Sequence, residues 1–289
     1  MSKLIPGEVV TLLVDREEEY GYFLKSDNSK DRVLLHNNEI QGEINIGDEV
    51  EVFIFQDKDG RLSATMTIPH IQLGVYGWGV VEGYRKNLGA FVNIGISKDI
   101  LVSVDDLPLV YDVWPKVKDQ LYITLRHDKN GRLFGKLATE EIIRDICVPA
   151  PENMYNKRVK GFVYKTKKVG SYVITEEGYR CFVHENERGK EPRLGQYVEG
   201  RVIDEKEDGS LNISLLPFKH EKMQEDSDII LNYLKMRAGA MPYSDKSTPN
   251  DILKNFEMSK GAFKRALGKL MKEGKIYQED GWTYTSDRK

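Results

Sequence analysis

An Asx-Gly turn flanked by alternating apolar residues recurs three times along this 289-residue chain. The three turns are Asp59-Gly60, Asn130-Gly131 and Asp208-Gly209. Alternation of apolar with mostly polar residues is the pattern of half-buried antiparallel strands. An Asx-Gly pair also suits the two positive φ angles of a type I′ hairpin turn. The sequence therefore predicts three β-hairpins of the same kind.

Two further short strands precede each hairpin at matching distances. The first carries a glycine and, two residues later, an aromatic residue: Phe23, Phe91 or Tyr172. The second ends at His36, Ser103 or His184, which lie 13, 12 and 12 residues after those aromatics. The turn glycine follows after another 24, 28 and 25 residues. Five short strands per repeat, one of them bent at glycine, favour a small closed barrel over a flat sheet.

The hydrophobic periodicity changes from two to about 3.6 residues after Pro217, which indicates a domain of another class. Helices are expected near residues 226–237 and 250–256, and a third begins after Ser259. Thr248 and Ser259 are typical helix caps. A hairpin with its turn at Asp280-Gly281 follows. Three helices and a hairpin resemble a winged helix.

Each repeat resembles the RNA-binding barrel of ribosomal protein S1, an OB-fold. The resemblance implies a face on which bases stack, formed by the aromatic before the glycine, the aromatic after it, and the histidine. The first repeat has all three, Tyr20, Phe23 and His36. The second keeps Phe91 alone, with Leu88 and Ser103 at the other positions, and the third has Tyr172 and His184 after Val169. Aromatic stacking binds bases with little sequence preference.

Charge is distributed unevenly behind a net charge of -3. Residues 1–66 hold 7 basic and 14 acidic residues, whereas residues 151–289 hold 26 and 22. No acid occurs between Glu152 and Glu176, a window that contains Lys165, Lys167 and Lys168. The third predicted helix of the C-terminal domain displays Lys260, Lys264 and Arg265. We expect these two basic clusters to contact phosphates, although a solvated lysine-rich surface has the same pattern.

The order of the modules, three S1-type barrels and then a winged helix, resembles the bacterial conserved virulence factor B family. We therefore expect a mainly β chain of three tandem five-stranded OB-fold barrels followed by a small α+β winged-helix domain. The predicted boundaries are 1–66, 67–148, 149–218 and 225–289. The resemblance implies RNA binding and an influence on bacterial gene expression. Together with the residue pattern, it leads us to expect binding of single-stranded RNA, regulation after transcription, and no cofactor, metal, membrane or small-molecule substrate.

Two other functions stay open. A DNA-binding transcriptional regulator would use the winged helix on duplex DNA, and that domain could equally dock a protein. A metal-dependent nuclease would need carboxylates, and Asp105-Asp106 is the only such pair near a motif strand. No phosphate-cradling glycine loop, nucleophile elbow or paired metal ligands are present, so no catalytic residue is predicted.

Cysteine content bears on the compartment. Cys147 and Cys181 are the only cysteines, too few for a disulfide scaffold. The first residues lack the apolar core of a signal peptide, and no run of about 18 apolar residues occurs. We expect a cytoplasmic protein.

Overall fold

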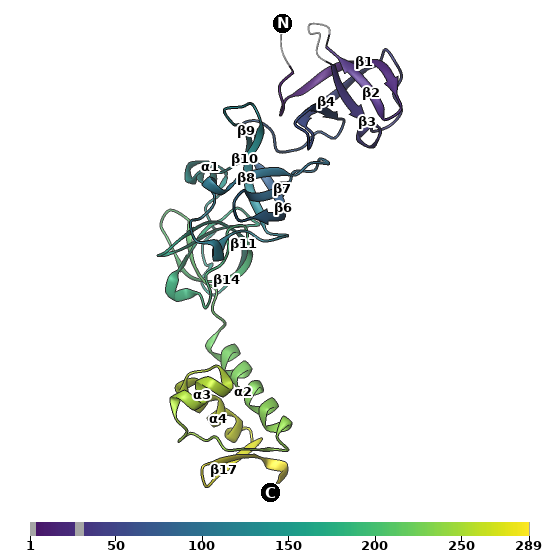
Figure 1. Ribbon diagram of the computed structural model, residues 1–289. Helices are drawn as coiled ribbons and strands as arrows, with labels where there is room; N and C mark the ends of the chain where they lie inside the picture. The colour runs from purple at the N-terminus through teal and green to yellow at the C-terminus, as the bar shows by residue number, and fades with distance from the viewer. Residues whose placement is uncertain (1–3, 27–31, 289) are drawn as a thin grey trace. The chain divides into compact units, whose positions relative to one another are not determined.

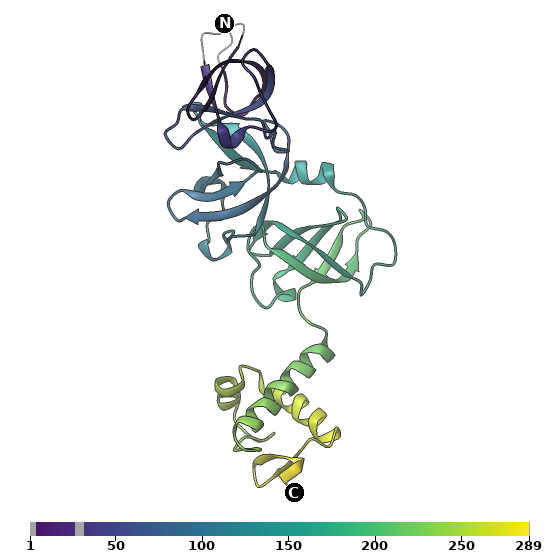
Figure 2. The same cartoon turned by 90° about the vertical axis from the view of Figure 1, so that its right-hand side faces the viewer.

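The computed structural model describes residues 4–26 and 32–288. The chain divides into two compact units, residues 1–215 and 216–289, and each is described by itself. The first unit contains three closed five-stranded barrels, and the second contains three helices and a three-stranded sheet (Figure 1; Figure 2). The predicted fold class is confirmed.

The barrels share one topology. Their strands, in chain order, are β1 (Val9–Glu18), β2 (Gly21–Lys25), β3 (Arg32–His36), β4 (Glu49–Gln56) and β5 (Leu62–Thr65); β6 (Gly77–Arg85), β7 (Gly89–Asn93), β8 (Ile100–Ser103), β9 (Gln120–His127) and β10 (Leu133–Leu137); β11 (Arg158–Lys167), β12 (Gly170–Thr175), β13 (Arg180–His184), β14 (Tyr197–Glu205) and β15 (Leu211–Ser214). The first strand of each barrel pairs with the second and the fourth, and the third pairs in parallel with the fifth. This pairing leaves no free edge in the barrel.

Close approach of neighbouring strands explains the glycine that opens the second strand of each barrel. A Cβ on Gly21 would lie 2.1 Å from the Leu35 carbonyl oxygen, and one on Gly89 would lie 2.0 Å from that of Val102. On Gly170 it would lie 2.4 Å from the Val183 carbonyl oxygen. Any larger residue would therefore force the second and third strands apart.

The three hairpin turns differ from the predicted type I′ geometry. Gly60 has a φ of +81°, whereas Asp59 is not among the residues with positive φ. The Gly60 amide donates to the Asp57 carbonyl, and the Asp57 amide donates to the Arg61 carbonyl. The loop between Asp57 and Arg61 therefore has three residues, one more than a two-residue turn. Asp128 and Lys206 begin the other two turns with the same pair of hydrogen bonds. The type I′ prediction was wrong because only the glycine takes the left-handed conformation of a bulged loop.

The middle barrel packs against both of its neighbours. Its core includes Phe53 and Phe55 of the first barrel and Leu194 of the third. Arg193 of the third barrel forms two hydrogen bonds to the buried Asp119 carboxylate of the second, at 2.9 and 3.0 Å. Between the second and third barrels lies helix α1 (Glu140–Ile146), whose first turn is capped by Thr139.

The second unit has the elements of a winged helix. They are α2 (Lys219–Met236), β16 (Ala240–Met241), α3 (Pro249–Phe256), α4 (Lys260–Lys272), β17 (Ile276–Glu279) and β18 (Trp282–Thr285). Thr248 and Ser259 cap α3 and α4 as predicted. Helix α2 begins seven residues before the predicted start at 226, in a polar stretch without apolar periodicity. The two-residue strand β16, which pairs with β18, was also not predicted.

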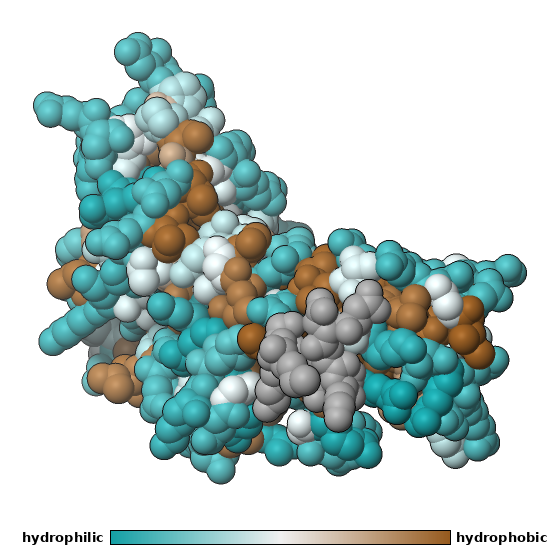
Figure 3. Space-filling model, turned by 90° about the horizontal axis from the view of Figure 1, so that it is seen from above, coloured by the Kyte–Doolittle hydropathy of each residue, from teal (hydrophilic) through white to brown (hydrophobic). Residues whose placement is uncertain are grey.

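In the view of Figure 3, brown hydrophobic residues lie among teal hydrophilic ones. In the described part of the chain, none of the helices has the length and apolar character needed to cross a bilayer. Scattered apolar residues are normal on a protein surface.

Candidate nucleic-acid interface

The predicted stacking rings on the second strand of each barrel lie beside a cation. Phe23 pairs with Arg16 across β1 and β2, and the Arg16 guanidinium carbon lies 4.7 Å from the ring centroid. Tyr172 pairs with Lys165, whose Nζ lies 5.7 Å from that ring. A β-bulge just before Arg16 and Lys165 turns both cations toward the rings. In the second barrel Phe91 pairs with Gly83, and the cation beside its ring is Arg85, whose guanidinium carbon lies 5.9 Å from the centroid.

The histidine that ends the third strand caps a short 3₁₀ turn. His36 Nδ1 accepts a hydrogen bond from the Asn38 amide, and His184 Nδ1 accepts one from Asn186. Ser103 Oγ accepts from the Asp105 amide in the same way. Ser103 therefore caps the turn as the histidines do, but it has no ring on which a base could stack. The second barrel retains the turn and lacks one stacking surface. In a neutral ring, this contact places the histidine proton on Nε2.

The position before the glycine is exposed in all three barrels. Tyr20 is 63% exposed, and Leu88 and Val169 at the equivalent positions are also exposed. Only the first barrel therefore presents an aromatic ring there. It also presents Phe23 and His36, but it lies in the acidic part of the chain.

The third barrel carries a continuous row of rings on β11, β12 and β13. Tyr164 lies 6.0 Å from Tyr172, Tyr172 lies 5.1 Å from Phe182, and Phe182 lies 6.3 Å from His184, centroid to centroid. Phe182 was absent from the predicted site. Leucines, Leu34 and Leu101, occupy its position in the other barrels. Alternation along β13 could have found it, because Phe182 lies two residues before His184 and so shares its face.

A basic hollow of about 320 Å³ lies over the two middle rings of this row, Tyr172 and Phe182. Its lining residues are Glu140, Arg144, Lys165, Lys167, Tyr172, Arg180, Cys181, Phe182, Lys206 and Ser210. Lys167 Nζ lies 6.0 Å from the Tyr172 ring, and Lys206 Nζ lies 5.8 Å from the Phe182 ring. Five basic side chains and one acid therefore surround two neighbouring aromatic rings, tilted by 55° to each other, an arrangement that suits a base and its phosphates.

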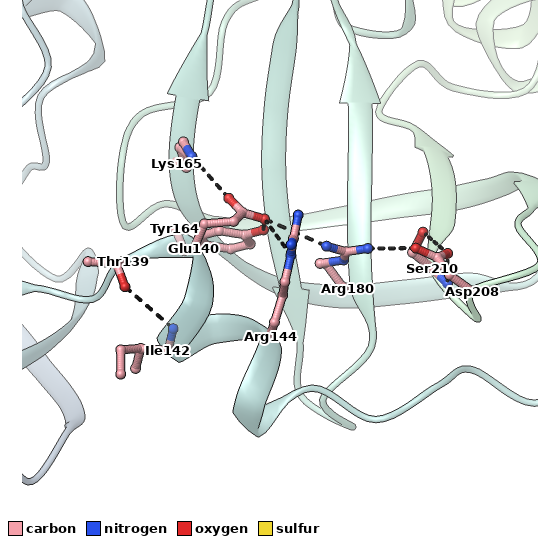
Figure 4. Close-up of polar contacts among 9 residues, drawn as sticks. All are labelled: Thr139, Glu140, Ile142, Arg144, Tyr164, Lys165, Arg180, Asp208 and Ser210. Atoms are coloured by element: carbon pink, nitrogen blue, oxygen red, sulfur yellow. Dashed lines mark hydrogen bonds and ion pairs between the residues drawn. The ribbon is translucent and has the colours of Figure 1, made fainter.

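One carboxylate, from α1, projects into the basic hollow (Figure 4). Glu140 accepts a hydrogen bond from the Tyr164 hydroxyl at 3.1 Å and one from Lys165 Nζ at 3.0 Å. Arg180 and Arg144 lie 3.7 and 3.9 Å from the same carboxylate. Although burial opposes ionisation, the hydrogen bonds from Lys165 and Tyr164 and the nearby cations lower the pKa of Glu140. Glu140 is therefore an anion at neutral pH.

The remaining predicted cations lie elsewhere. Lys168 lies in the turn after β11, next to the basic hollow rather than in its lining. Lys260, Lys264 and Arg265 lie on α4 in the second unit, where Lys264 and Arg265 are exposed. Helix α4 contains no acidic residue, and its inner face is buried in the winged-helix core. The structure thus unites Lys165 and Lys167 with Tyr172, and leaves α4 as a separate basic surface.

The aspartates considered for a nuclease make structural contacts. Asp106 binds Arg126 at 2.5 Å, and Asp105 lies 3.3 Å from the Ser103 hydroxyl. Burial raises the pKa of Asp106. Across residues 4–26 and 32–288, no three His, Cys, Asp or Glu side chains gather in a group that could hold a metal ion.

Protein-family models match four consecutive parts of the chain. Residues 6–67 match an S1 domain, 76–136 the first S1-like domain of CvfB, 143–217 the second domain of the virulence regulatory factor CvfB, and 228–284 a CvfB-like winged helix domain. The domain that the family model numbers first is thus the second barrel here.

Relatives match over almost the whole length. An uncharacterized Bacillus subtilis protein, YitL, is 52% identical over 96% of this chain and 93% of its own. Conserved virulence factor B of Staphylococcus saprophyticus is 38% identical over 97% and 94%. A crystal structure from Streptococcus pneumoniae, described as a multidomain protein with nucleic acid binding domains, matches with a TM-score of 0.68 and 39% identity, over 97% of this chain and 98% of that one.

Proposed function

We propose that this chain, which belongs to the conserved virulence factor B family, binds single-stranded RNA and regulates gene expression after transcription without catalysing a reaction. The observation that carries the proposal is the basic hollow of the third barrel, where Tyr172 and Phe182 lie under a group of lysines and arginines. The free thiols Cys147 and Cys181 suit a reducing compartment, so we place this activity in the cytoplasm.

The chemistry of the basic hollow favours a single strand over a duplex. Stacking on Tyr172 or Phe182 needs a base whose face is exposed, which a paired base inside a helix does not offer. Lys167 and Lys206, each near a ring, would then neutralise phosphates next to the stacked bases. The description of the pneumococcal relative, which has nucleic acid binding domains, supports the same class of ligand.

The first barrel and α4 would each add weaker contacts to RNA. Tyr20, Phe23 and His36 offer rings, but 14 acidic residues within positions 1–66 repel phosphates. Lys260, Lys264 and Arg265 offer charge on the second unit. These assignments predict that the third barrel supplies most of the affinity.

A binding comparison tests the proposal. Fluorescently labelled single-stranded RNA, single-stranded DNA and duplex DNA of one sequence are titrated with the full chain at two salt concentrations. We expect single-stranded RNA to bind most tightly, and Tyr172→Ala to weaken it. Tyr155→Ala is the matched control, because Tyr155 is exposed in the loop before β11 and outside the basic hollow.

Two outcomes would favour the competing functions. Tightest binding to duplex DNA, lost on replacing Lys264 and Arg265, would indicate a DNA-binding regulator that uses α4. Magnesium-dependent shortening of the labelled RNA, abolished by Asp105→Asn with Asp106→Asn, would indicate a nuclease.

A further inference from the structure

We infer that the Glu140 carboxylate occupies a phosphate-binding position in the third barrel, and that a phosphate of the bound strand displaces it from Lys165 and Arg180. The inference rests on the proposed function, since it concerns the same basic hollow. It adds a specific phosphate site and a carboxylate that competes for that site, which lowers the affinity of the wild-type protein for RNA.

The groups around Glu140 are those that bind a phosphate. An ammonium, two guanidinium groups and a phenolic hydroxyl, from Lys165, Arg180, Arg144 and Tyr164, converge on its two oxygens. A phosphodiester presents two charged oxygens to donors as a carboxylate does. Three of these side chains, Lys165, Arg180 and Arg144, also line the basic hollow beside Tyr172, so a strand stacked there would bring its phosphates to this position.

Comparison with the first barrel shows that the carboxylate paired with Lys165 in the third barrel comes from outside the barrel, whereas Arg180 also pairs with Asp208 of the β14–β15 turn, at 2.7 Å. In the first barrel Asp15, the bulge residue of β1, binds Lys25 at 2.7 Å and Arg32 at 2.8 Å. Arg32 and Arg180 begin equivalent strands, four residues before the capping histidine. The bulge residue of β11 is Tyr164, which bears no charge at neutral pH, and Glu140 supplies the carboxylate in its place.

The location of Glu140 makes exchange feasible. Asp15 is the bulge residue of a strand paired on both sides, and its short side chain is only 13% exposed. Glu140 is the first residue of α1, a seven-residue helix outside the strand pairing of the third barrel, and its side chain is 23% exposed. A side-chain rotation could therefore release Lys165 without disturbing a strand.

Neutralising Glu140 tests the inference. Affinity for a labelled single-stranded RNA is measured for the wild type, Glu140→Gln and Glu141→Gln across a series of salt concentrations. Glu141 is the matched control, because it is the next residue of α1, carries the same charge and is exposed to solvent. We expect Glu140→Gln to bind about threefold to tenfold more tightly, the effect of removing one charge about 4 Å from cations in a largely aqueous setting.

The salt dependence separates direct competition from a general change in net charge. If one more phosphate reaches Lys165 and Arg180, the slope of log affinity against log salt steepens by roughly 0.7 on a single strand. Glu141→Gln should leave the slope unchanged. Glu140→Asp supplies a second variant that leaves the net charge unaltered. Its side chain is shorter by one methylene, which draws the carboxylate back from Lys165 and should tighten binding about twofold to fivefold.

The outcomes are distinguishable. Equal affinities and slopes for Glu140→Gln and Glu141→Gln, or weaker binding by Glu140→Gln, would overturn the inference and make Glu140 a brace for Lys165. If Glu140→Gln does not fold, as judged by its circular dichroism and thermal transition, Glu140→Asp decides: an affinity equal to or below that of the wild type overturns the inference. Failure of the wild type to bind single-stranded nucleic acid at all would instead overturn the proposed function.

Discussion

Replacing Phe182 with leucine should weaken RNA binding and leave the fold intact. Leucine already occupies this position in the other two barrels, as Leu34 and Leu101, so the strand pairing accommodates it. Phe182 is half-buried, and a change between apolar residues at such a site destabilises by less than about 1.5 kcal/mol. The ring, however, extends the surface of Tyr172, 5.1 Å away.

The expected loss follows from stacking. A base on an aromatic ring contributes roughly 1 to 3 kcal/mol, and leucine retains part of the apolar contact. We therefore expect a loss of about 1 to 2 kcal/mol, or roughly 5- to 30-fold in affinity. The salt slope should not change, because the substitution removes no charge.

Fluorescence anisotropy of a labelled single-stranded RNA, measured at several salt concentrations, gives both quantities. Phe134→Leu is the matched control, because Phe134 is a half-buried ring in the second barrel with Arg132 at 5.6 Å from its centroid. An equal loss in the two variants, or a flatter salt slope in Phe182→Leu alone, would refute the assignment of Phe182 to the stacking surface.

Three further predictions follow from the same structure. Lys167→Ala should weaken RNA binding and flatten its salt slope by roughly 0.7, whereas an unchanged slope in the titration would place the phosphates elsewhere. Arg193→Met should lower stability by about 2 to 4 kcal/mol, seen as a lower denaturant midpoint, because it leaves the Asp119 carboxylate buried without its guanidinium; an unchanged midpoint would contradict this. Burial raises the pKa of Cys181 to about 12 and also raises that of Cys147, so thiolates are scarce at pH 8. Iodoacetamide should therefore label both slowly in the native protein and rapidly in guanidinium, and fast native labelling by mass spectrometry would count against the buried environment.

Part of the candidate site could be recognised from local sequence. Tyr172 follows a glycine and His184 ends a strand, at the same positions as in the first repeat. The stretch without acidic residues indicated Lys165 and Lys167. The family motif does not include the position of Phe182, although alternation along β13 places it on the same face as His184. The assignment of roles to these residues remains a prediction.

Local patterns determined most of the architecture. Period-two alternation marked the hairpins, and the cap residues Thr248 and Ser259 marked the starts of α3 and α4. Such signals are reliable because they depend on backbone geometry within a few residues. The closed barrels could also be predicted from the sequence, because each of the three repeats has five short strands, one of them bent at a glycine.

Only the tertiary structure decided which distant side chains meet. Glu140 lies 25 residues before Lys165, and nothing in their spacing indicates that α1 brings the two together. Leu194 likewise completes the core of a barrel other than its own. Local periodicity specifies which face of an element is buried, but the partner across that face depends on how strands and linkers pack in three dimensions. The net charge of the basic hollow was therefore a property of the fold, and it could not be read from the lysines alone.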